Sequence, residues 1–159
     1  MSRWVLGLAW AGALFHLGAG LLAPELFFFN VGQSLLYVLL LWLVRRELKT
    51  SVLYGIALGL MWGIIHLGLT RWVVTSGFGL WFNWRIALDA DPSSPLALAL
   101  VLVNASLVLD CGAFYWKRTE RCWADLRFLG GSLTLLAVYY GILFWLFQPL
   151  WLSAFVTIL

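Results

Sequence analysis

The chain has 159 residues, of which 64% are hydrophobic and only 11% are charged. A soluble domain of this size has too little interior to bury so much apolar surface, so the composition excludes a soluble globular protein and indicates a membrane protein. The formal net charge of +3 is small. We therefore expect no nucleic-acid partner, and the lipid bilayer is the expected surrounding.

Apolar runs, separated by polar or proline-containing segments, follow one another along the chain. Pro24 ends the first run, and the basic pair Arg45-Arg46 follows the second. Each run is long enough to cross a hydrocarbon layer of ~30 Å at ~1.5 Å per residue. The pattern predicts an all-α integral membrane protein, a single domain over residues 1–159 that forms a bundle of five transmembrane helices. The expected spans are residues 4–23, 27–44, 51–76, 95–116 and 128–148.

Two further segments are apolar without being expected to span. Residues 77–95 contain Leu80, Trp81, Trp84 and Leu88 at helical spacing. They predict a short helix that lies on the outer membrane surface between the third and fourth spans. Residues 149–159 follow Pro149 and are expected to form an interfacial or bent tail.

The positions of the basic residues predict the orientation. With five spans, eight of the ten basic residues fall on the side of the N-terminus, and only Arg71 and Arg85 fall on the other side. Because cytoplasmic loops are enriched in Lys and Arg, we expect a multi-pass protein of the cell (inner) membrane. Its N-terminus is expected in the cytoplasm and its C-terminus outside. Trp4, Trp42, Trp116 and Trp123 are expected at the inner interface, where Trp is favoured.

His16 and His66, the two histidines of the chain, are the main candidate site residues. Each is followed by Leu-Gly, and each lies about 11 Å below the outer end of its predicted helix. An ionisable side chain at this depth is costly and usually functional. Glycines lie on the same helix faces, namely Gly12 in the first helix and Gly55, Gly59 and Gly63 in the third. If the first and third helices are neighbours, the two imidazoles face each other across a glycine-lined slot.

Such a slot suits a haem b. His16 and His66 would be the axial ligands of the iron, and Gly12, Gly59 and Gly63 would admit the flat macrocycle. Arg71, about one turn beyond His66, would neutralise the propionates. In this respect the chain resembles the membrane-anchor cytochromes of quinone-linked dehydrogenases. The resemblance implies electron transfer with a soluble partner supplied by another chain, and no enzyme activity of the chain on its own.

A second interpretation of the same residues is structural. Glycines every four residues are typical of close helix packing, and a membrane histidine can hydrogen-bond to Asn30 or Gln33. The ridge of Gly55, Gly59 and Gly63 would then pack against another membrane protein or a second copy of the chain. The protein would be a non-catalytic structural or assembly subunit. A third interpretation is an oligomeric small-molecule binder or transporter.

Asp110 is a further ionisable residue within a predicted span. It lies near the cytoplasmic end of the fourth helix. A proton or cation site is one interpretation. We favour a pairing with Arg45, Arg46 or Arg118 at the inner surface.

Overall fold

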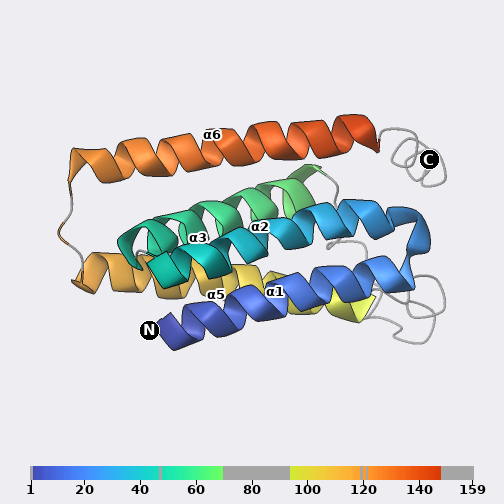
Figure 1. Cartoon of the computed structure of the whole chain (residues 1–159), viewed down its shortest axis with the longest axis horizontal. Helices are drawn as coiled ribbons and strands as arrows, with labels where there is room; N and C mark the ends of the chain where they lie inside the picture. The colour runs from blue at the N-terminus through green and yellow to red at the C-terminus, as the bar shows by residue number, and fades with distance from the viewer. Residues whose placement is uncertain (1, 47, 70–93, 119, 121, 148–159) are drawn as a thin grey trace.

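The computed structural model describes residues 2–46, 48–69, 94–118, 120 and 122–147 (Figure 1). Over these residues the chain is all-helical and has no strand. Helices α1 (Ser2–Leu22), α2 (Phe27–Arg46), α5 (Ser94–Arg118) and α6 (Trp123–Leu146) are each long and apolar enough to span a membrane. The predicted class, a helical multi-pass membrane protein, is confirmed at this level.

The third predicted span, residues 51–76, begins as helix α3 (Leu48–Gly63) and continues as a π-helical segment (Ile64–Leu69). The π form is rare, and it often marks a functional position because it turns side chains away from their α-helical directions. His66 lies within this segment. The remainder of the predicted span, the predicted interfacial helix up to residue 93 and the tail of residues 149–159 lie outside the described residues.

The helix ends follow local chemistry. Pro24 lacks an amide hydrogen, and it ends α1 in a short 3-10 turn, Pro24–Leu26, as predicted. Helix α6 begins at Trp123, five residues before the predicted start of the fifth span at residue 128. The reason is a capping interaction, in which the backbone N–H of Cys122 donates to Oδ2 of Asp125 over 3.0 Å. This bond satisfies an amide at the helix start.

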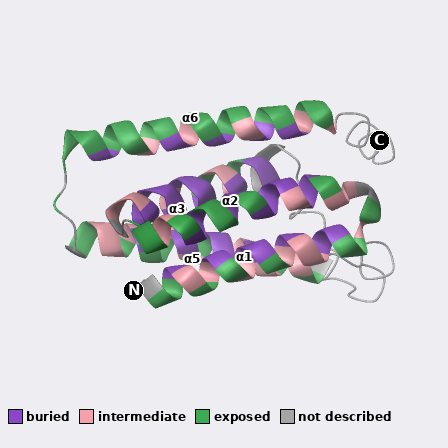
Figure 2. Ribbon diagram, in the orientation of Figure 1, coloured by how far each residue is buried: buried purple, intermediate pink, exposed green. Residues whose placement is uncertain are grey.

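Four helices form a ring, and successive helices run in opposite directions (Figure 1). Helix α1 contacts α2 and α5, and α3 contacts the same two helices from the other side. Helices α1 and α3 therefore lie on a diagonal of the ring, so the condition for the predicted slot, that these two helices are neighbours, is not met. Helix α6 packs against α3 outside the ring. Most of its surface is exposed (Figure 2).

Close helix contacts depend on several glycines, and the two tightest are at Gly12 and Gly59. A Cβ at Gly12 of α1 would overlap the ring of Tyr37 on α2. A Cβ at Gly59 of α3 would lie 2.7 Å from the backbone oxygen of Asn104 on α5. These glycines therefore bring α1 onto α2 and α3 onto α5 within the chain.

The end of the bundle that holds the N-terminus also holds the α2–α3 and α5–α6 connections (Figure 1). Arg45, Arg46, Lys49 and Lys117 belong to this end, as do the exposed side chains of Trp4, Trp42, Trp116 and Trp123. The described basic residues and four of the tryptophans thus gather at one end, as the sequence predicts.

One ion pair joins α6 to α3 at this end of the bundle. Nζ of Lys49 lies 2.8 Å from Oδ1 of Asp125, whose other oxygen accepts a hydrogen bond of 2.6 Å from the Tyr115 hydroxyl. The hydrogen bond to Asp125 raises the pKa of the Lys49 ammonium. The carboxylate therefore connects α3, α5 and α6 at this end of the bundle.

The expected ion pair of Asp110 with Arg45 or Arg46 is not formed in the described part of the chain. The Asp110 side chain is exposed on α5, and the ion pair of Lys49 with Asp125 is the one formed within the described part of the chain. The side chain of Arg118, the third expected partner, lies outside the described residues.

Candidate functional site

Helix α2 presents a polar face to the interior of the bundle. Asn30, Gln33 and Tyr37 are spaced by three and four residues, so they lie on one side of the helix. All three side chains are buried. A buried polar group needs a hydrogen-bond partner, most of all inside a membrane, so this face determines which side chains the other helices place against it.

His16 of α1 binds the first of these residues. Its Nδ1 lies 3.3 Å from Oδ1 of Asn30, and Nδ2 of Asn30 donates to the carbonyl oxygen of Leu26 over 3.1 Å. Because the amide nitrogen of Asn30 donates to Leu26, the Asn30 atom that faces His16 is the oxygen. An oxygen accepts, so Nδ1 of His16 carries the proton. Nε2 is then an acceptor. It is buried and has no hydrogen-bond partner among the described residues.

His66 binds the second residue of the polar face. Its Nε2 lies 2.8 Å from Oε1 of Gln33, which also accepts a hydrogen bond of 3.3 Å from the Tyr140 hydroxyl of α6. The imidazole packs on the indole of Trp62, with 4.7 Å between ring centroids. His66 therefore lies against two other helices, α2 at Gln33 and α6 at Tyr140, and is only 2% exposed.

Tyr37 extends the same face toward α5. Its hydroxyl donates to Oδ1 of Asn104 over 2.9 Å, and Nδ2 of Asn104 donates to the carbonyl oxygen of Leu100 over 2.8 Å. We call Asn30, Gln33 and Tyr37, together with their partners, the polar core. The partners are His16, His66, Asn104 and Tyr140.

The two histidines hydrogen-bond to Asn30 and Gln33, the two side chains that the structural interpretation named as partners. The sequence missed Tyr37 and Tyr140 as partners. The spacing of residues 30, 33 and 37 was the signal for Tyr37, because it places a third polar group on the same face. No spacing within α6 marks Tyr140. It becomes a partner only because the fold places it against Gln33 of α2.

The slot predicted for haem b is filled in this arrangement. The Tyr37 ring occupies the space beside Gly12, and Asn104 occupies the space beside Gly59. The Trp62 ring covers His66, whose Nε2 is bonded to Gln33. As folded, the residues present do not fit a macrocycle held by both histidines. Arg71 lies outside the described residues. Whether the protein binds haem is not tested by these contacts and stays a prediction.

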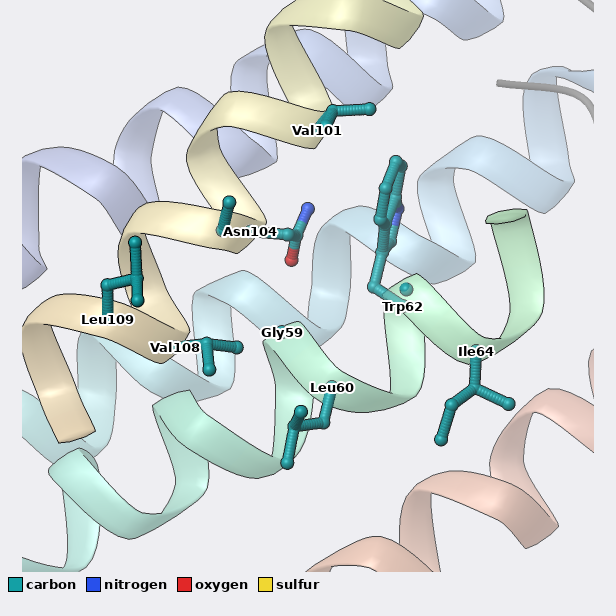
Figure 3. A pocket seen from close by; sticks show the side chains of 10 residues that line it. Gly59, Leu60, Trp62, Ile64, Val101, Asn104, Val108 and Leu109 are labelled. Carbon is teal, nitrogen blue, oxygen red and sulfur yellow. The ribbon is translucent and has the colours of Figure 1, made fainter. Parts of the chain in front are cut away.

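The structure also contains a groove that the sequence did not predict. It lies between α3 and α5, has a volume of about 450 Å³ and is lined mainly by apolar side chains (Figure 3). Gly63 leaves it open, because within the described part of the chain a Cβ at this position would meet no atom of a neighbouring segment within 4 Å. The exposed side chains of Leu60, Ile64 and Leu109 border it. The groove therefore opens on the apolar surface that faces lipid in a membrane.

Two polar side chains stand in the wall of this groove, Trp62 and Asn104 (Figure 3). Trp62 packs on His66, and Asn104 accepts the hydrogen bond of Tyr37, so the groove adjoins the polar core. Nε1 of Trp62 is buried and has no hydrogen-bond partner among the described residues. The sequence did not mark Trp62 as a site residue, because it lies among many tryptophans of a membrane protein.

Comparison of the chain with protein-family models, curated proteins and solved structures gave no match. The candidate function therefore rests on the geometry of the polar core and of the groove.

Gln33→Leu is expected to destabilise the bundle by about 1–2 kcal/mol, because Gln33 accepts hydrogen bonds from both His66 and Tyr140. Titration of the purified protein with sodium dodecyl sulfate measures the loss. Thr134→Val is the control, since its exposed hydroxyl bonds only within α6. Equal unfolding midpoints for the two variants would show that the polar core does not hold the helices together.

Proposed function

We propose that the protein crosses the inner membrane five times and binds a small, largely apolar molecule in the groove between α3 and α5. The groove is the observation that supports binding. Its volume of about 450 Å³ lies within the range of roughly 300–1,000 Å³ typical of small-molecule sites. Like such sites, it combines an apolar lining with a few polar groups.

Four passes are the four long helices, and the remaining pass, third in chain order, is α3 with its π-helical continuation. From Ser51, where the predicted span begins, to Leu69 they run without interruption over about 27 Å at up to ~1.5 Å per residue. This length is close to the hydrocarbon thickness of a typical membrane, about 30 Å. With five passes, the end that holds the basic residues is cytoplasmic and the C-terminus lies outside. The interfacial helix within residues 77–95 is part of the same proposal.

The proposal is binding without catalysis. Both histidines form hydrogen bonds to side-chain amides, and these bonds orient the rings within the bundle. A ligand in the groove would contact Trp62 and Asn104 instead, and neither side chain is a typical acid, base or nucleophile. Packing of the ridge of Gly55, Gly59 and Gly63 against another chain stays a prediction. Gly55 and Gly59 already face α5 within this chain.

The topology is tested with the two native cysteines. Cys122 is exposed at the end of the bundle that holds the basic residues, and Cys111 is buried. A membrane-impermeant maleimide is expected to label the protein in inverted vesicles and to leave it unlabelled in intact spheroplasts. Cys122→Ser should abolish the labelling, because Cys111 is covered. Labelling in intact spheroplasts would reverse the proposed orientation.

Gly63→Leu is expected to weaken binding in the groove by about tenfold or more, because the new side chain enters space that a ligand would use. The probe is decylbenzene, an apolar molecule with no hydrogen-bonding group. Its saturable retention is measured on protein in nanodiscs and compared with empty nanodiscs. Gly141→Leu is the matched control, since its Cβ also meets no atom within 4 Å and it lies outside the groove. Equal binding by both variants, or no saturable binding by the native chain, would exclude the groove.

Haem binding with electron transfer is the second candidate function. It is favoured by His16, whose Nδ1 is bonded to Asn30 while its Nε2 has no partner among the described residues. A histidine that ligates a metal is commonly held in this way, through its other ring nitrogen. On this hypothesis, with His16 as the iron ligand, the purified protein shows a Soret band that His16→Ala removes. A colourless protein would exclude it.

A further inference from the structure

Two buried hydrogen-bond donors lie directly behind the apolar surface of the groove, on Trp62 and Asn104. Nε1 of Trp62 is a donor only, and it has no partner within the described residues. Nδ2 of Asn104 carries two hydrogens, and its bond to Leu100 uses one of them. The acceptor of the same amide, Oδ1, is taken by Tyr37. A ligand that matches this wall therefore presents an acceptor.

The acceptor is expected to be neutral. Within the part of the chain that the structure describes, no charged side chain lines the groove. An anionic carboxylate or phosphate would lose its hydration there without gaining a counter-charge, which is costly inside a membrane. A neutral carbonyl oxygen can accept hydrogen bonds from an indole and an amide without this cost.

The depth of the groove selects among carbonyl compounds. Trp62 lies 11 residues after Ser51, the start of the predicted span, and therefore about 16 Å into a hydrocarbon layer of ~30 Å. This position is close to the middle of the membrane. The ester carbonyls of phospholipids lie at the interface, about 15 Å away, so the bulk lipid does not supply the acceptor. The ligand must carry its carbonyl into the middle of the bilayer.

We infer that the groove binds a neutral, mostly hydrocarbon molecule through a carbonyl oxygen that accepts a hydrogen bond from the indole N–H of Trp62. This inference rests on the proposed binding function and specifies the ligand class. Nε1 is covered in the present conformation. Binding therefore requires a rotation of the indole that turns Nε1 toward the groove. Such a carbonyl belongs to a quinone ring or to the ester of a single long chain.

The test compares three probes on the full chain in nanodiscs of dioleoylphosphatidylcholine. Decylubiquinone carries ring carbonyls, methyl palmitate carries a chain ester, and decylbenzene carries no carbonyl. Retention of each probe above that of empty nanodiscs gives an apparent Kd. The native chain is expected to bind at least one carbonyl probe about three- to tenfold more tightly than decylbenzene, the effect of one neutral hydrogen bond. Which carbonyl probe binds identifies the source of the acceptor.

Trp62→Phe removes the N–H and keeps an aromatic ring. It is expected to weaken binding of the carbonyl probe about three- to tenfold and to leave decylbenzene binding unchanged. Trp10→Phe is the matched control, because Trp10 is exposed on α1 away from the groove. Equal affinity of the native chain for all three probes would overturn the inference, whether or not the Trp62 variant folds. So would an unchanged carbonyl affinity in a folded Trp62→Phe variant.

The two proposals fail in different ways. If Gly63→Leu blocks decylbenzene while carbonyl probes show no advantage, the groove binds apolar molecules and only the role of the Trp62 N–H is wrong. If no probe binds saturably to the native chain, the proposed function itself is wrong.

Discussion

The arrangement of this bundle depends on the hydrogen bonds that Gln33 accepts from His66 and Tyr140. Inside a membrane, side chains gain little by leaving lipid for protein, since both surroundings are apolar, so specific polar contacts and close packing select the helix neighbours. Gln33 joins α3 and α6 to α2 through one oxygen atom. Asn30 and Tyr37, on the same face, join α1 and α5. Each helix is thereby held at one rotation about its own axis.

The groove results from a change in the packing between α3 and α5, next to the polar core. At Gly59 the helices approach so closely that no Cβ would fit, whereas one turn later a Cβ at Gly63 would meet no atom of another described segment within 4 Å. The change from contact to open space produces the groove. Trp62 lies between these glycines, and its ring covers His66 on one side and forms part of the groove wall on the other. A ligand in the groove would therefore lie one side chain away from His66, and through Asn104 it would adjoin Tyr37.

The histidine pair shows how a correct local observation can lead to an incomplete model. The matching positions of His16 and His66 in their helices were read from the sequence, and both rings do point into the bundle. The sequence-based model placed them face to face, whereas each binds its own amide on α2, at residues three positions apart. The structural interpretation already contained these partners. The ring order of the helices, which places α1 and α3 on a diagonal, is the part that the sequence did not show.

The sequence by itself determined the membrane class, the helical runs, the turn at Pro24 and the gathering of basic residues and tryptophans at one end. These properties depend on hydrophobic length, on proline and on charge, which are local to each segment. Only the tertiary structure decided that α1 and α3 lie on a diagonal, that Tyr140 reaches Gln33 and that a groove opens beside Trp62. The physical reason is that the lipid-facing and protein-facing sides of these helices are both apolar. No hydrophobic periodicity then distinguishes them, and neighbours are selected by contacts between residues far apart in the chain.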